Sequence, residues 1–536
     1  MKKRLSTLAL LVAAALPCLQ ACGDWTSFRN GGSSSAEKLP TNWTPDNIAW
    51  QLELTGYGQS TPVILGEKVF VASVVGPMKE KCLVQCFDLK SGSERWQFSC
   101  PSTKRVPSNY MASRAAPTPV VDEKGLYVFF ETGDLVALDL SGKKLWQRVL
   151  SEEFGEFENN HGLGSSPAQN GSHLFLNLEH KGPSHLVALN KSNGKTEWTV
   201  DRPSGSSWSS PIVVDSEGSA KVLVSFAGAV TSYNASSGKE TWSVDGLDGN
   251  SVPSPTVSGD KLFIGARLPE FAEEGSIRSN CCLDLASLSS GSPEIIWKAD
   301  KAISDYASPV VAGDFVYFIN RVGVLHCLDV NSGEMHYRKR LSGSCWATPL
   351  VSGSNVYLFC KDGMTQVIEA GQEFKLVAEN RIWDPTSPPK PETYVENKSR
   401  GGHGHSSHGQ SSGSAQHGAA KRGDPNSTAF KSGPPAGASR RPGGGMIAAL
   451  MRGDANGDGI LEGDEISKDF QPMLARVDKN KDGKLDAKEL EAMAKSFAER
   501  RAGARTGAAD PIVYGIAASD GNIVVRTGTR LYCIRN

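Results

Sequence analysis

The sequence has no surplus of basic residues and, after its first 21 positions, no apolar run long enough to span a bilayer. It holds 57 Lys and Arg against 58 Asp and Glu, a formal net charge of −1. No basic stripe interleaved with aromatic residues occurs, so a nucleic-acid partner has no electrostatic footprint. A membrane-spanning helix needs about 20 apolar residues. We therefore expect the chain after residue 21 to be soluble or tethered at its N-terminus.

The first 21 residues have the order of a secretory signal peptide. Three basic residues at positions 2–4 precede an apolar run from Leu8 to Leu16 and the segment Leu19-Gln20-Ala21-Cys22. The small residue before Cys22 resembles a bacterial lipoprotein cleavage site, which makes Cys22 a lipidation candidate; the alternative is ordinary cleavage near Ala21 and a free cysteine. Removing residues 1–21 changes the formal net charge to −4. We expect export to the periplasm or cell envelope.

A sequence repeat sets the predicted fold. Its clearest copy runs from Pro119-Val120-Val121 through Leu135-Val136-Ala137-Leu138-Asp139 to Ser141-Gly142-Lys143-Lys144-Leu145-Trp146. The marker proline recurs at intervals of 40 to 57 residues, at Pro62, Pro119, Pro167, Pro211, Pro255, Pro309 and Pro349. The closing aromatic recurs as Trp96, Trp146, Trp198, Trp242, Trp297 and Tyr337. Short strands between Gly-rich turns, without a helical period, predict one four-stranded propeller blade per unit.

An eighth unit is divided between the two ends of the chain. The segment from Gly515 to Ile534 supplies three strands, and Ile48 to Leu52, with Trp50, supplies the fourth. Closure by both termini removes an exposed sheet edge. We predict an all-β, eight-bladed propeller over residues 24–381 and 511–536.

The repeat resembles a known group of proteins. Ser-Gly-Lys-x-x-Trp after Ala-Leu-Asp is similar to the tryptophan-docking repeat of the quinoprotein-like (pyrroloquinoline-quinone-like, BamB-like) eight-bladed propellers. Asp24 to Gly32 also resembles the opening of many secreted members. The resemblance implies the fold but no single activity, because the group includes quinone-dependent dehydrogenases as well as envelope proteins without that activity.

Residues 382–510 form an insertion before the last blade. We assign 382–445, rich in Gly, Ser, Pro and His, to a flexible linker. We assign 446–502 to a small α-helical EF-hand pair, because two complete twelve-position calcium loops begin at Asp454 and Asp478. Hard Ca²⁺ takes oxygen ligands, and alternate side chains converge as each loop winds round the ion. The predicted ligands are Asp454, Asn456, Asp458, Ile460 (carbonyl) and Glu465, then Asp478, Asn480, Asp482, Lys484 (carbonyl) and Glu489. Leu461 and Leu485 should face each other between the loops.

The cysteines leave two questions open. Cys281-Cys282 resembles the adjacent cysteine pair of quinone-dependent dehydrogenases. Cys282, however, aligns with Ala137, a position also held by Cys86, Cys327 and Cys533, which indicates a small buried strand residue. The pairs Cys82/Cys100 and Cys345/Cys360 flank turns symmetrically, so each could bond across neighbouring strands after export, the alternative being free buried thiols.

The candidate ligand site is the central funnel of the propeller. The segments that enter the innermost strands carry Tyr57, Arg114, His161, Trp208, Asn250, Tyr306 and Trp346. The alternative is that these side chains only pack the funnel mouth.

The sequence assigns no catalytic residue. We predict a monomeric, exported, calcium-binding propeller that binds a protein or glycan partner. The alternatives are a quinone-dependent dehydrogenase and a dockerin-like attachment protein; the 24-residue offset of the calcium loops favours the latter, and Glu at position twelve departs from it.

Overall fold

A computed structural model describes most of the chain. The described residues are 23–107, 112–159, 161–216, 218–226, 228–267, 280–299, 301–389 and 515–535, with 454, 458, 460–465, 482–486 and 489–490. The chain falls into two compact units, residues 1–397 with 509–536 and residues 398–508. No described helix is long and apolar enough to cross a membrane.

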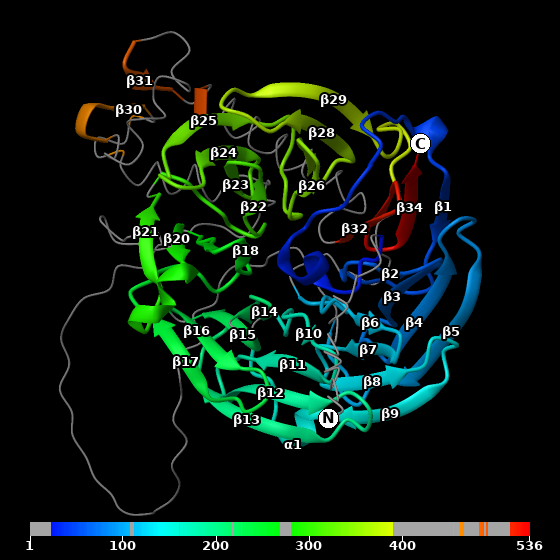
Figure 1. The fold of residues 1–536 in the computed structure, drawn as a ribbon. Coiled ribbons are helices and arrows are strands. Elements are labelled where there is room, and N and C mark those ends of the chain that lie inside the picture. The colour runs from blue at the N-terminus through cyan, green and yellow to red at the C-terminus, as the bar shows by residue number, and fades with distance from the viewer. Residues whose placement is uncertain are drawn as a thin grey trace, which may run out of the picture. The chain divides into compact units, whose positions relative to one another are not determined.

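Seven consecutive antiparallel sheets form blades 1 to 7 of a ring (Figure 1). Blades 1 to 3 are β2 (Val63–Leu65), β3 (Lys68–Val75), β4 (Lys81–Asp88), β5 (Glu94–Pro101); β6 (Val120–Asp122), β7 (Gly125–Phe129), β8 (Asp134–Leu138), β9 (Lys144–Val149); β10 (Ala168–Gln169), β11 (His173–Leu178), β12 (Ser184–Asn190), β13 (Thr196–Arg202). Blades 4 and 5 are β14 (Ile212–Ser216), β15 (Ser219–Phe226), β16 (Ala229–Asn234), β17 (Glu240–Val244); β18 (Thr256–Ser258), β19 (Lys261–Ile264), β20 (Cys281–Asp284), β21 (Glu294–Lys298). Blades 6 and 7 are β22 (Val310–Ala312), β23 (Phe315–Ile319), β24 (Val324–Asp329), β25 (Met335–Arg340); β26 (Leu350–Ser352), β27 (Asn355–Phe359), β28 (Met364–Glu369), β29 (Lys375–Arg381).

Each marker proline directly precedes the innermost strand of its blade, as the repeat predicts. Helical turns are few among the described residues: η1 (Phe28–Gly32), η2 (Pro45–Asn47), α1 (Leu150–Glu153), η3 (Leu285–Ser290) and, in the second unit, η4 (Gly463–Glu465). Blades 1 to 7 therefore follow the predicted repeat.

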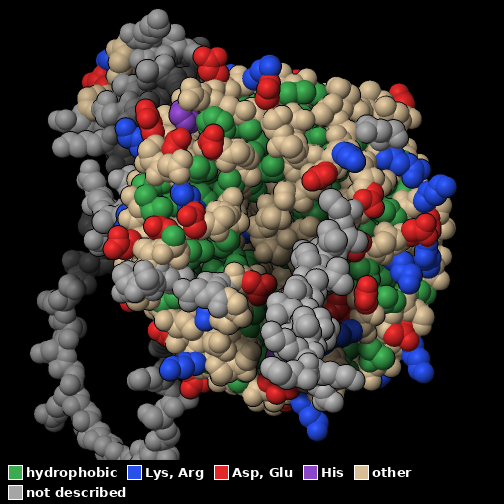
Figure 2. Space-filling view, in the orientation of Figure 1, with side chains coloured by type: hydrophobic (Ala, Val, Ile, Leu, Met, Phe, Trp, Pro, Cys, Tyr) green, Lys and Arg blue, Asp and Glu red, His purple; other side chains and the backbone are tan. Residues whose placement is uncertain are grey.

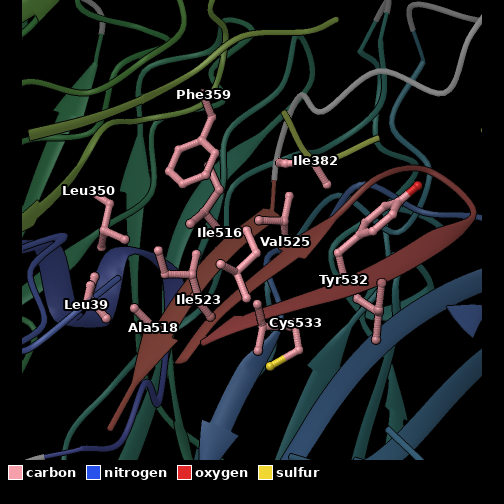
Figure 3. Close-up of a cluster of buried hydrophobic side chains, with 14 of the residues drawn as sticks. Leu39, Leu350, Phe359, Ile382, Ile516, Ala518, Ile523, Val525, Tyr532 and Cys533 are labelled. Carbon is pink, nitrogen blue, oxygen red and sulfur yellow. The ribbon is translucent and has the colours of Figure 1, made fainter. Parts of the chain in front are cut away.

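Both chain ends build blade 8, which confirms the predicted closure and, with blades 1 to 7, the predicted all-β, eight-bladed propeller. Its strand order is β1 (Trp50–Glu53), β34 (Arg530–Arg535), β33 (Asn522–Arg526), β32 (Gly515–Ser519), and Trp50 pairs with Cys533. Figure 3 shows side chains of blade 8 and blade 7 converging with Leu39 in one apolar cluster. Because this cluster joins residues from both termini, hydrophobic burial holds the ring closed.

The recurring tryptophan and glycine make one contact between neighbouring blades. The indole N–H donates to the next blade from Trp50 to Leu89 O, Trp96 to Leu140 O, Trp146 to Lys191 O, Trp198 to Ala235 O and Trp297 to Val330 O, at 2.9–3.2 Å. The ring also covers a glycine there: a Cβ on Gly142, whose φ is +89°, would lie 2.7 Å from Trp96. Gly291 is an exception, with no atom within 4 Å of its Cβ position, so Trp242 does not dock on it.

Hydroxyl groups form a second link between blades, which we call the hydroxyl ring. The residues just before the marker prolines are Thr61, Thr118, Ser166, Ser210, Ser254, Ser308 and Thr348. In all six consecutive pairs the backbone N–H of one donates to the side-chain oxygen of the next, at 2.8–3.0 Å. Gly515 takes this place in blade 8, where the Arg526 guanidinium instead donates to Ser60 Oγ and O. The Ser/Thr-Pro signature therefore joins seven blades around the channel.

Residues 25–36, the channel segment, lie inside the ring (Figure 1). Trp25 pairs with Ile64 of blade 1, and Ser35 pairs with Val351 of blade 7. Between them, Arg29 and Gly32 reach blades 5 and 4. The segment thus contacts the innermost strands of blades on opposite sides of the channel and braces them from within.

The second unit contains one described sheet of two short strands, β30 (Leu461–Glu462) and β31 (Lys484–Leu485). Leu461 pairs with Leu485, and both side chains are buried. The predicted contact between these two leucines is confirmed. The start of the predicted linker needs a correction, because Ile382 and Trp383 are buried in the propeller cluster that also holds Tyr532. Residues 390–453 lie outside the described residues, as do residues 1–22 with the predicted signal peptide and Cys22.

Candidate functional site

The candidate site is the end of the ring formed by the segments that precede the marker prolines. All innermost strands run in the same direction, so these segments share one end of the propeller. Figure 2 shows one face of the ring, on which lysine and arginine side chains are interspersed with carboxylates. No single-sign patch marks that view of the surface.

Four of the seven predicted funnel residues are half-buried and form two ring pairs. His161 and Trp208 have ring centroids 5.8 Å apart, and the Trp208 indole donates to Gly162 O at 3.1 Å. Tyr306 and Trp346 have ring centroids 4.9 Å apart. Each pair presents part of its aromatic surface to solvent, which suits stacking against a ligand.

A lysine completes the second pair. Lys361 Nζ lies 3.7 Å from the centroid of the Trp346 ring, within the range of a cation–π contact. The backbone N–H of Lys361 also donates to Ser344 O at 2.9 Å. Trp346 therefore contacts both Tyr306 on the preceding segment and Lys361, which lies two residues after β27.

The other three predicted funnel residues do not reach the surface. Tyr57 is 1% exposed, and its hydroxyl donates to Gly76 O at 2.7 Å. Arg114 is 2% exposed and donates to Ala112 O. Asn250 is 1% exposed and donates to Ser225 Oγ and Ala229 O. These side chains organise loops, so the predicted ligand set reduces to the two ring pairs.

Buried ion pairs lie beneath this end of the ring. Lys79 and Glu131, on the turns of blades 1 and 2, are 3.0 Å apart with both side chains almost fully buried. Lys79 also donates to Ser113 O at 2.5 Å, and Glu131 accepts from the Ala115 N–H at 2.9 Å. In blade 3, Arg202 contacts Glu179 at 2.9 Å. Both carboxylates are thus occupied by internal partners. Among the described residues no group of three or more His, Cys, Asp and Glu is arranged to hold a metal ion.

The adjacent cysteines are structural strand residues. Cys281 and Cys282 of β20 are buried in two different apolar clusters, on opposite faces of the strand. Burial raises the pKa of each thiol to about 12. Cys282 faces Trp297 across the sheet, as Cys86 faces Trp96 and Ala137 faces Trp146. The prediction of a small residue at this position is confirmed, and the strand geometry does not bring the two sulfurs together as a vicinal disulfide requires.

The described parts of the two calcium loops have matching hydrogen bonds. The backbone N–H of Ile460 donates to Asp458 Oδ1 at 2.8 Å, and that of Lys484 donates to Asp482 Oδ1 at 2.9 Å. Glu465 and Glu489 each accept a backbone N–H from three residues earlier, at 3.3 Å. Asp454 is also described, whereas Asn456, Asp478 and Asn480 lie outside the described residues. The side chain at position five of each loop therefore accepts the same backbone hydrogen bond, from the residue two positions later.

Sequence reasoning missed the buried role of Arg29. This side chain is 2% exposed and donates to Ser254 O, Pro255 O and Thr256 Oγ1 at 2.7–3.0 Å. The only signal was its place in the opening segment 24–32. Its partners in blade 5 lie more than 200 residues away in sequence, and no local pattern predicts such contacts.

Fold and repeat contacts define the class: an eight-bladed, tryptophan-docked propeller closed by both termini. A family model described as outer membrane protein assembly factor BamB matches residues 42–172, 155–273 and 284–373, more than half of the chain. The protein belongs to this BamB-like, pyrroloquinoline-quinone-repeat family.

Individual relatives match this chain over a short stretch or at low sequence identity. BamB of Legionella pneumophila (strain Paris) is 32% identical over 81 residues, which are 15% of this chain and 21% of that protein. Among solved structures, BamB from Moraxella catarrhalis is 14% identical, with 63% of this chain and 91% of that chain covered and a TM-score of 0.45. Quinohemoprotein alcohol dehydrogenase from Comamonas testosteroni is 12% identical, with coverage of 67% and 73% and a TM-score of 0.48.

Proposed function

We propose that this protein is an exported scaffold of the cell envelope that binds a protein partner at the funnel end of its propeller. The observation that carries the proposal is the pair of half-buried ring clusters, His161 with Trp208 and Tyr306 with Trp346. Aromatic side chains supply large contact area at low entropic cost, and they are enriched at binding hot spots. The family assignment supports an envelope location, since the matched relative is named as an outer membrane protein assembly factor.

The neighbouring charges favour binding over catalysis. Glu131 and Glu179, two buried carboxylates near this end, are each engaged by a cation and a further hydrogen bond. A third, Asp134, accepts hydrogen bonds from Thr103 and Thr132. A general base needs an accessible carboxylate within reach of its substrate. The two half-buried ring pairs are therefore the groups that we assign to contact with a partner.

We further propose that the insert binds two calcium ions and is exported together with the propeller. The matching position-five hydrogen bonds and the paired leucines support this assignment. Extracellular calcium loops need only weak affinity, because calcium is abundant there. The ions would order the insert.

Photo-crosslinking in living cells tests the binding proposal. A photoreactive phenylalanine analogue replaces Trp346 or Trp208, and the control carries it at Leu145, which is 49% exposed on the outer strand β9. We expect protease-sensitive adducts at the two funnel positions and none at Leu145. Adducts of equal yield at all three positions, or none in the funnel, would overturn the proposal; an adduct removed by a glycosidase would replace the protein partner by a glycan.

A further inference from the structure

Two buried cysteines at the funnel end lie within contact distance of each other. Cys345 is in the segment that enters β26, and Cys360 directly follows β27. Their Sγ atoms are 2.9 Å apart, and the residues are 1% and 0% exposed. The backbone bond from Lys361 N–H to Ser344 O keeps the two segments side by side. The two thiols therefore lie close enough to react with each other without any loop movement.

We propose that Cys345 and Cys360 form a disulfide in the exported protein, and that this bond fixes one half of the funnel mouth. Trp346 follows the first cysteine and Lys361 follows the second, and these two side chains stack on each other. A covalent link between their neighbours restricts both segments at once. The His161–Trp208 pair has no cysteine among its described neighbours in sequence, so the link would act on one ring pair only.

The reaction needs a disulfide oxidant, such as oxidised glutathione or a thiol-oxidising enzyme of the envelope. One cysteine thiolate attacks the oxidant, whose S–S bond breaks and releases one thiol; the second cysteine thiolate then displaces the other. Overall the two cysteines lose two electrons and two protons, and the oxidant gains them as two thiols. Because both sulfurs are buried, this exchange takes place while blade 7 folds.

Three other buried cysteines provide internal controls. Cys281 and Cys282 are adjacent in sequence, yet they face separate clusters. Cys327 faces Tyr337 across the sheet. We expect all three to remain thiols under conditions that oxidise Cys345 and Cys360.

Peptide mass spectrometry tests the disulfide directly. Trypsin cuts after Arg340 and Lys361, so both cysteines fall in the single peptide 341–361. The purified full-length protein is unfolded, refolded in a glutathione buffer, denatured again, alkylated with iodoacetamide and digested. We expect peptide 341–361 to escape alkylation and to lack two hydrogen atoms, and to take up two labels once a reductant is added.

Peptides 279–298 and 322–338, which hold Cys281, Cys282 and Cys327, should be fully alkylated in the same digest. Two labels on peptide 341–361 without reductant would overturn the disulfide.

This inference rests on the proposed function in two respects: export supplies the oxidising compartment, and the effect on the funnel presupposes partner binding there. Separate measurements distinguish failure of the disulfide from failure of the proposed function. The refolding experiment depends on neither export nor a partner. Cell fractionation tests export by itself. With the disulfide established, Cys345→Ser should lower photo-crosslinking several-fold from position 346 and leave position 208 unchanged. Equal yields in both proteins at position 346 would overturn the proposed effect on the funnel.

Discussion

Replacing Ser210 by alanine removes one link of the hydroxyl ring with little change in shape. Ser210 Oγ accepts the Ser166 N–H at 2.9 Å, and the two residues are 4% and 3% exposed. The substitution leaves that N–H buried without its acceptor, while Ser210 N–H keeps its bond to Ser254 Oγ at 2.8 Å. An orphaned buried N–H costs about 1–3 kcal/mol, so we expect a loss of about 2 kcal/mol in the free energy of unfolding.

Urea unfolding followed by tryptophan fluorescence measures this loss as a lower midpoint at an unchanged m-value. Ser210→Thr should retain most of the stability, because Thr118 and Thr348 fill equivalent places. Ser237→Ala is the matched control: this exposed hydroxyl donates to Asn234 Oδ1, and its removal should change stability by less than about 0.5 kcal/mol. Equal midpoints for Ser210→Ala and Ser237→Ala would refute the structural role of the ring.

Two further predictions concern stability. Gly142→Ala should cost about 2–4 kcal/mol, because its Cβ would displace the Trp96 ring from a residue with φ of +89°, whereas Gly313→Ala, in open space, should cost about 1 kcal/mol in the same urea assay. Lys79→Met should cost about 3–5 kcal/mol by leaving Glu131 buried without its cation, and adding Glu131→Gln should recover part of that loss; a double variant less stable than Lys79→Met alone would contradict this.

The propeller could be predicted from the sequence because its repeat encodes contacts between neighbouring blades. Glycines such as Gly142 accommodate the preceding tryptophan, and Trp50 reveals the blade shared by both termini. Gly291 fits the same pattern without that contact, since η3 replaces the usual turn. The pattern therefore fixes the number of blades and their closure more firmly than it fixes every contact.

The candidate site was only partly predictable. Position before a marker proline places a residue at the funnel end, but it cannot show that Asn250 turns inward to satisfy Ala229 O or that Tyr57 reaches Gly76 O. The Lys79–Glu131 pair joins turns of two blades, and Arg29 reaches blade 5 through the channel. These partners are far apart in sequence and follow from ring closure, which local spacing does not describe.

Calorimetric titration of the calcium-stripped protein with Ca²⁺ tests the central claim, that a propeller of this family carries a calcium-binding insert. We expect about two ions to bind, one for each loop, and binding to disappear in the Glu465→Ala, Glu489→Ala double variant. Glu373→Ala, an exposed carboxylate of the propeller, should bind like the unaltered protein. No binding by the unaltered protein would contradict the calcium assignment, and undiminished binding by the double variant would contradict its placement in the two loops.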